Sequence, residues 1–111
     1  MKKEPILEPD LKFEHHLEFK SSDEMNEMFA DDNRPLSELI VDVALENLDT
    51  TIEIIPVVSI LTKEDDLIYD VIIDRVDMVE TLEQNLMLME DYEDYGRCQK
   101  ITDALFYLNN R

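Results

Sequence analysis

A chain of 111 residues with 28 acidic and only 10 basic side chains has a formal net charge of -18, which argues against direct binding to nucleic acid phosphates or anionic membranes. Hydrophobic residues make up 44% of the sequence, enough for a folded core and too many for a wholly disordered chain. The single glycine, Gly96, excludes every phosphate-binding loop that is built on several glycines.

The length fits one domain. Residues 1–10 contain two prolines and mixed charge, so we expect a flexible N-terminal tail there and a single small domain over residues 11–111. No apolar run approaches the roughly 20 residues that span a bilayer. The lone cysteine, Cys98, cannot form an internal disulfide and suits a reducing compartment, which predicts a cytoplasmic protein.

The first predicted element is a β-strand over residues 11–19. Apolar or ring-bearing side chains alternate there with charged or polar ones; the first set is Leu11, Phe13, His15, Leu17 and Phe19. A period of two residues is typical of a half-buried strand. If this strand finds no mate in its own chain, it is suited to join the edge of a partner's sheet.

Two short helices are expected next. Ser21 is followed three residues later by Glu24, the spacing of a helix-starting capping box. Residues 31–35 read as a turn, and Pro35 can open the second helix because its missing N–H does no harm in a first turn. An apolar face for this helix comes from Leu36, Leu39, Ile40, Val43 and Leu48.

Residues 50–61 leave two structures open. Their many β-branched side chains favour a strand. Thr50 and Glu53 have the spacing of another capping box, which favours a helix, although Pro56 inside that helix would cost about 3 kcal/mol. An extended or kinked segment is the prediction.

Residues 63–91 have the longest helical pattern, since apolar side chains recur there at about 100° per residue: Ile68, Ile72, Val79, Leu82 and Leu86. A turn over residues 91–96 precedes a last helix, and so short a link predicts an antiparallel hairpin. The expected fold class is therefore α+β and predominantly α. It has an N-terminal strand, short helices and a long acidic helix in a C-terminal antiparallel helical hairpin.

The turn and last helix carry a local resemblance. The sequence from Asp94 to Leu105 resembles the second half of the UVR motif, a helical hairpin of excinuclease subunits and of some Clp-type chaperones and their adaptors. The positions that match are Asp94, Tyr95, Cys98, Ile101, Asp103 and Leu105, whereas Gly96, Gln99 and Thr102 depart from the pattern. With the preceding helix the likeness covers residues 82–105. It implies a hairpin that is used for protein–protein contact.

The candidate binding site is a ridge of carboxylates three or four residues apart on the polar face of the predicted long helix: Asp66, Asp70, Asp74, Asp77 and Glu80. On a helix they would follow one another at about 5–6 Å and could imitate a nucleic acid backbone. Residues 64–94 hold 12 acidic side chains against one basic residue, Arg75. The alternative is a solvated helix face without a binding role.

Arg75 completes the predicted partner-binding set. It falls within the apolar arc of the predicted helix, so its guanidinium requires a polar partner, either an acid from another helix or a bound protein.

No catalytic, cofactor or metal site is predicted. His15 and His16 would face opposite sides of a strand, no stretch has the ligand spacing of an EF-hand, and Cys98 reads as a buried structural thiol.

The resulting hypothesis is a non-enzymatic acidic protein that binds a protein partner with a basic surface. Its concrete form is an inhibitor or regulator of a nucleic-acid-handling protein that mimics the charge of nucleic acid, without itself binding nucleic acid or membrane. The alternative is a structural or adaptor subunit that docks into a larger assembly through its apolar helical hairpin. A small hydrolase that uses scattered carboxylates is the third and weakest reading.

Overall fold

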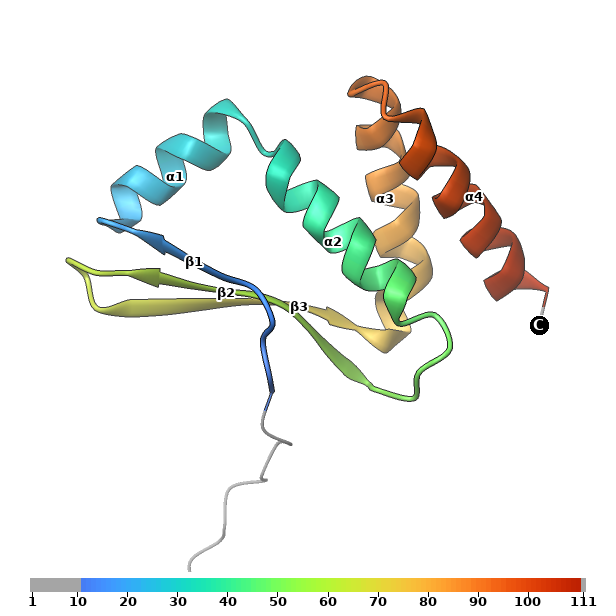
Figure 1. The fold of residues 1–111 in the computed structure, drawn as a ribbon, viewed down its shortest axis with the longest axis horizontal. Coiled ribbons are helices and arrows are strands. Elements are labelled where there is room, and N and C mark those ends of the chain that lie inside the picture. The colour runs from blue at the N-terminus through green and yellow to red at the C-terminus, as the bar shows by residue number, and fades with distance from the viewer. Residues whose placement is uncertain (1–10, 111) are drawn as a thin grey trace, which may run out of the picture.

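The computed structural model describes residues 11–110, so the predicted tail at residues 1–10 lies outside the described part of the chain. The predicted α+β class, mainly α, is confirmed (Figure 1). In chain order the elements are β1 (His16–Phe19), α1 (Ser22–Asp31), α2 (Arg34–Glu46), β2 (Ile54–Thr62), β3 (Leu67–Asp74), the 3-10 turn η1 (Arg75–Asp77), α3 (Met78–Asp91) and α4 (Tyr95–Asn109).

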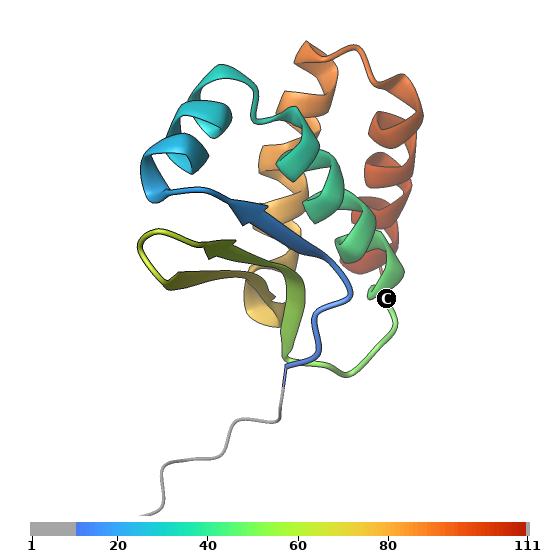
Figure 2. The same cartoon turned by 60° about the vertical axis from the view of Figure 1, so that its left-hand side comes forward.

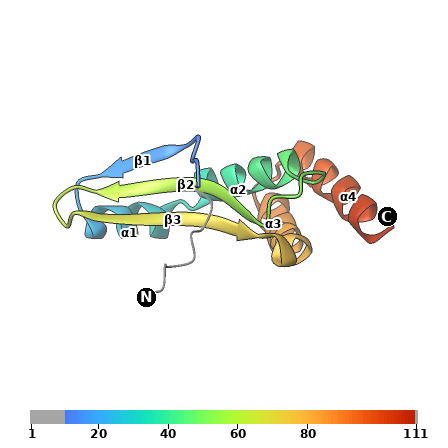
Figure 3. The same ribbon diagram turned by 90° about the horizontal axis from the view of Figure 1, so that it is seen from below.

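The strands form one sheet in the order β1-β2-β3 (Figure 3). β1 pairs in parallel with β2, with His16 opposite Ser59, and β2 pairs antiparallel with β3. The N-terminal strand therefore finds its mate within the chain. It is shorter than the predicted range of 11–19, although Phe19 points into the core as the alternation requires.

All the helices of residues 11–110 lie on one face of the sheet, and no element of this part of the chain covers the other face (Figures 1 and 3). α2 packs on β2 and α3 on β3, while α4 packs on α2 and α3, away from the sheet (Figure 2). The core fills the space between these layers. Its largest fully buried hydrophobic side chains come from both strands and helices and are Val41, Ile55, Val57, Val58, Ile60, Leu82, Met89 and Ile101.

Local signals fix the start of α1. Ser21 caps the helix, and its hydroxyl accepts a 3.1 Å hydrogen bond from the N–H of Glu24. The Glu24 carboxylate accepts from the N–H of Lys20 at 2.8 Å, one residue earlier than in an ideal capping box. In α2, Pro35 occupies the first turn as expected.

The sequence leaves the structure of residues 50–61 open, and most of this stretch lies in strand β2, over residues 54–62. Pro56 lies beside an irregularity, because the register with β3 shifts between Pro56 and Val58. A bulge is one of the few places where a strand accepts proline. The β-branched composition of the segment therefore outweighs its possible helix cap.

The expectation of one long helix over residues 63–91 is wrong in its first half. Residues 63–66 form a turn, residues 67–74 form β3, and α3 begins only at Met78. A spacing of four residues returns a side chain to the same face both on a helix and on a strand. Ile68 and Ile72 satisfy both periods, so their spacing could not distinguish the two structures.

The predicted C-terminal helical pair is present, and its connection is tight. The N–H of Asp94 donates to the carbonyl of Met89 at 2.9 Å, and the N–H of Glu93 donates to that of Glu90 at 3.0 Å. This pattern is a Schellman motif, in which Glu93 takes the left-handed position with φ of 59°. Asp94 then caps α4 by accepting from the N–H of Arg97.

Candidate functional site

The five carboxylates of the predicted ridge lie on several elements and do not form one helical row. Asp66 lies in the β2–β3 turn, Asp70 and Asp74 lie on β3, Asp77 lies in η1, and Glu80 lies in the first turn of α3. Four residues along a strand cover about 13 Å, not the 5–6 Å of a helix. The evenly spaced ridge is therefore corrected to a looser acidic band.

Part of this band still shares a surface. Asp70 lies opposite Ser59, whose hydroxyl donates to its carboxylate at 2.9 Å, and Asp74 lies opposite Ile54. Both are an even number of residues from Ile68, which is exposed, and an odd number from Ile73, which is buried under the helices. Asp70 and Asp74 therefore project from the bare side of the sheet.

We call this bare side the open face. Its side chains follow from the strand registers and are His16, Glu18, Ile54, Pro56, Ser59, Leu61, Ile68, Asp70, Ile72 and Asp74. Apolar and acidic groups thus alternate along β3 at the surface. At the turn end of the sheet Lys63 pairs with Glu18 at 3.1 Å, so one of these carboxylates is already balanced within the chain.

β3 is also exposed on its other face. Leu67 and Tyr69 point towards the helix layer, yet 47% and 37% of their surfaces remain accessible, while Ile68 and Ile72 are 67% and 42% exposed on the open face. One strand therefore holds four of the large exposed hydrophobic residues of the described chain. Such a concentration of exposed apolar surface marks an interaction site more often than isolated residues do.

Arg75 is held inside the chain. Its guanidinium donates to the carbonyls of Asn47 and Ile52 at 2.7 and 3.0 Å, and to the Thr50 hydroxyl at 2.6 Å. Its own N–H donates to the carbonyl of Glu53 at 2.7 Å. The residue thus fastens the α2–β2 loop to the end of β3, and its partners in the chain are carbonyls and a hydroxyl, not an acid from another helix.

The β2–β3 turn is tied to α1. The carboxylate of Asp65 accepts from the N–H of Ser22 at 2.6 Å. Hydrogen bonding with the Ser22 side chain, and then with its N–H, lowers the pKa of Asp65. The Ser22 hydroxyl lies 3.0 Å from that of Tyr69. These contacts hold the first half of β3 against α1 without covering its outer side.

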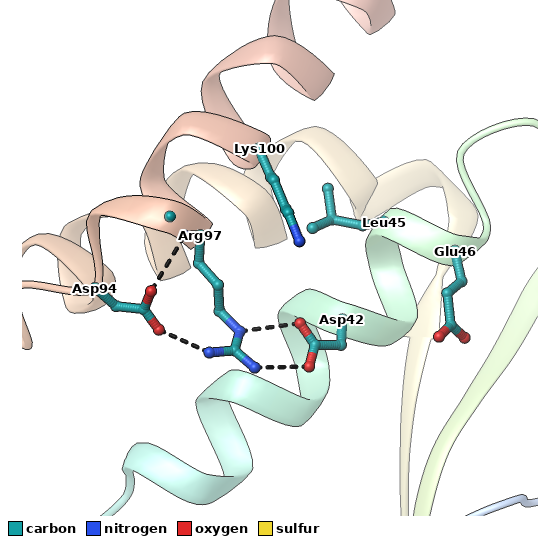
Figure 4. A pocket seen from close by; sticks show the side chains of 7 residues that line it. Asp42, Leu45, Glu46, Asp94, Arg97 and Lys100 are labelled. Atoms are coloured by element: carbon teal, nitrogen blue, oxygen red, sulfur yellow. Dashed lines mark hydrogen bonds and ion pairs between the residues drawn. The ribbon is translucent and has the colours of Figure 1, made fainter.

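A second candidate is an ion-pair cleft of about 520 Å³ between α2 and α4 (Figure 4). Arg97 lies at its centre and donates to both carboxylate oxygens of Asp42 at 2.9 and 2.8 Å and to Asp94 at 2.7 Å. Hydrogen bonds from Arg97 lower the pKa of Asp94, and those to Asp42 and Asp94 raise the pKa of Arg97. Both shifts stabilise the charged forms and move the two pKa values further from neutral pH. A group that transfers protons near neutral pH requires a pKa close to 7.

The ion pairs that line this cleft connect α2 to α4. Glu38 of α2 accepts from Arg34 at 2.8 Å and lies 3.8 Å from Arg97, and Arg34 in turn lies 5.4 Å from the centre of the Tyr92 ring. Lys100 lies beside this network and makes no ion pair with any residue between 11 and 110. The network connects α2 to both helices of the hairpin.

Neither the cysteine nor the histidines assemble a reactive site. Cys98 is half-buried on α4, and desolvation, then the charges of Glu90 and Asp94, raise the pKa of its thiol. His15 and His16 are both exposed, and His16 lies 2.9 Å from the carbonyl of Phe13. Between residues 11 and 110, no three His, Cys, Asp or Glu side chains gather closely enough to hold a metal ion.

Sequence reasoning missed two sets of residues. The helical spacing places Ile68 and Ile72 on the apolar face of a helix, although the run from Leu67 to Ile73 is rich in β-branched residues, a signal for a strand. Arg97 is not predicted by any local pattern, because its partner Asp42 is 55 residues away in the sequence.

Comparisons with protein families, with curated proteins and with solved structures find no match to this chain. The resemblance to the UVR hairpin stays an expectation. None of the helices within residues 11–110 has both the length and the apolarity that crossing a membrane requires.

Proposed function

We propose that this chain is a non-enzymatic interaction protein that binds a basic surface of another protein. The observation that carries the proposal is the open face of the sheet, where the exposed side chains of Ile68 and Ile72 alternate along β3 with the carboxylates of Asp70 and Asp74. Apolar side chains supply affinity in protein interfaces, and surrounding charges select and steer the partner.

The charge of the whole chain favours the same partner. A net charge of -18 attracts basic proteins over long distances and repels acidic ones. Proteins that handle nucleic acids carry clustered Lys and Arg side chains for phosphate binding, so they are the class that fits best. Occupation of such a surface by this chain would inhibit or regulate that protein, although the carboxylates do not reproduce an even row of phosphates.

A decisive experiment compares the chain with a variant in which Asp66, Asp70, Asp74 and Asp77 are changed to Asn. Both are used to capture partners from nuclease-treated lysate of the source cell, and the affinity for each captured protein is then measured at two salt concentrations. The captured partner should be basic, and its binding to the parent should weaken as salt rises. Loss of four exposed charge pairs should cost about 1–4 kcal/mol and flatten the salt dependence.

The matched control removes four carboxylates elsewhere, by changing Glu27, Glu83 and Glu90 to Gln and Asp31 to Asn. It alters net charge equally but leaves the open face intact. Equal losses in the two variants would show that overall charge alone attracts the partner. Unchanged affinity in the first variant would refute the proposal.

The alternative, an adaptor that docks through its helical hairpin, is favoured by a different observation. Three side chains of the hairpin are exposed, Met87 on α3 and Tyr95 and Phe106 on α4. The hairpin residues Leu82 and Ile101 are instead buried in the core. Binding through these side chains would hardly depend on salt. It would be lost in a variant that carries Met87→Ser and Phe106→Ser, which the open-face proposal predicts to bind normally.

A further inference from the structure

The outer side of β3 is a strand edge with unpaired backbone groups. Among residues 11–110, β3 pairs only with β2. Ser59 of β2 donates its N–H to the carbonyl of His15 on the β1 side. The N–H and C=O of Ser59 therefore point towards β1 and away from β3. Opposite residues of an antiparallel pair share the same bonding state, so the N–H and C=O of Asp70 point outwards, and those of Ile68 and Ile72 follow by alternation.

The charged side chains on this edge strand are carboxylates, Asp70 and Asp74. Natural edge strands are commonly blocked by charged side chains, above all lysine, by proline or by a bulge. β3 contains neither lysine nor proline, and the irregularity of this sheet lies on β2. Its side chains are accessible on both faces, since Leu67 and Tyr69 are exposed on the helix side and Ile68 and Ile72 on the open face. An added strand would therefore find apolar contacts on both of its own faces.

Charge decides what kind of strand fits. Asp66, Asp70 and Asp74 recur every fourth residue, and the last two project on the open face. A second copy of this chain would bring another net charge of -18 to this edge, and an antiparallel pair centred on Asp70 would set Asp70 against its counterpart and Asp66 against Asp74. Like charges directly opposite destabilise a strand pair, whereas opposite charges stabilise it.

We propose that the outer edge of β3 binds an extended, basic segment of a partner protein as a fourth strand of the sheet. The segment carries Lys or Arg at every fourth residue, opposite Asp70 and Asp74, and β-branched or apolar side chains between them. Its other face lies against Leu67 and Tyr69. This inference rests on the proposed function, because it names how a basic partner is held.

The test uses a synthetic nine-residue peptide of sequence Thr-Val-Lys-Val-Thr-Val-Lys-Val-Thr and the full chain. Binding is measured by fluorescence anisotropy, and backbone hydrogen exchange is followed by NMR. The peptide should bind, and exchange at the N–H groups of Ile68, Asp70 and Ile72 should slow. A peptide with Glu in place of both Lys residues should bind at least about tenfold more weakly.

Two isomeric peptides separate strand pairing from general charge attraction. One carries N-methyl groups on residues 3, 5, 7 and 9 and the other on residues 2, 4, 6 and 8, so composition and charge are the same. A docked strand directs only one of these sets towards β3, so one isomer should lose about tenfold or more in affinity and the other should bind nearly as the parent peptide does. Equal binding of both isomers, or no binding by any peptide, would overturn the proposal.

Protein variants supply the matching control. Asp70→Asn together with Asp74→Asn should weaken peptide binding by about 2–30-fold, while Glu83→Gln with Glu90→Gln should change it much less. Slow exchange at Asp70 in the free chain would also count against the proposal. If it depended on protein concentration, a second copy would be the occupant; if it disappeared when residues 1–10 were removed, the N-terminal segment would be.

These outcomes leave the proposed function separately testable. Capture of a basic, salt-sensitive partner together with failure of the methylation test would mean that the partner lies flat on the open face. Success of the peptide test with no basic partner in the cell would instead retain the edge and reject the proposed function.

Discussion

Arg97 of α4 holds both carboxylate oxygens of Asp42 on α2, at 2.9 and 2.8 Å, and so joins the C-terminal hairpin to the helix that lies on the sheet. The planar guanidinium makes both bonds at once and still reaches Asp94. An ammonium group could not reproduce this geometry.

Arg97→Lys should therefore destabilise the fold while preserving charge. The expected loss is about 1–2 kcal/mol, kept modest because Asp42 is partly exposed to solvent. Urea unfolding at pH 7 measures it, with Lys100→Arg as the neighbouring control that should stay within about 0.5 kcal/mol of the parent. A negligible difference between Arg97→Lys and the parent would mean that apolar packing alone fixes the hairpin.

The ionisation of Asp94 should make the free energy of unfolding depend on pH in the acidic range. Its hydrogen bonds with Arg97 lower its pKa in the folded state, so folding favours the ionised form. The stabilisation is present above the ordinary pKa of about 3.9 and is lost as pH falls through the lower folded pKa. Asp94→Asn should thus destabilise the chain at pH 7 and have a shrinking effect below pH 4. Denaturant unfolding of both proteins between pH 3 and 7 measures the difference, which a pH-independent gap would contradict.

Glu93 offers a stabilising substitution. It holds the left-handed position that ends α3, where glycine is the favoured residue. Glu93→Gly should raise the free energy of unfolding by about 0.5–1 kcal/mol. Thermal unfolding checks this, and Glu90→Gly inside α3 should instead destabilise by about 1 kcal/mol.

Ile68 and Ile73 on the same strand should behave oppositely. Ile68→Ser removes an exposed side chain and should change stability by no more than about 0.5 kcal/mol, while weakening partner binding. Ile73 is buried, so Ile73→Ser should cost several kcal/mol through lost burial and an unpaired hydroxyl. Melting curves for the two variants report which face of β3 is inside. Similar losses in both would show that the assignment of faces is wrong.

The success and failure of sequence reasoning have separate physical causes. Elements that are specified locally were predicted well: Ser21 caps α1, and the C-terminal helices form a pair. β3 was missed because its identity depends on pairing with β2, and because Ile68 and Ile72 make its solvent side apolar and conceal the alternation. The predicted ridge is wrong for the same reason. Its carboxylates, expected on one helix, lie on a turn, a strand, the 3-10 turn η1 and the start of α3. Charge alone nevertheless predicts that most of these carboxylates are exposed, and only Asp74 is half-buried.

The parallel pairing of β1 with β2 also sets an order for biosynthesis. β1 leaves the ribosome first, but Ser59, which lies opposite His16, is made about forty residues later. At bacterial or eukaryotic elongation rates this is a wait of about 2–8 s, during which Leu17 and Phe19 have no sheet to join. The β2–β3 hairpin and the α3–α4 pair, by contrast, can each close as soon as they emerge. The oldest strand therefore waits longest for its partner, and a nascent polypeptide that is stalled before residue 62 would present that strand unpaired to chaperones.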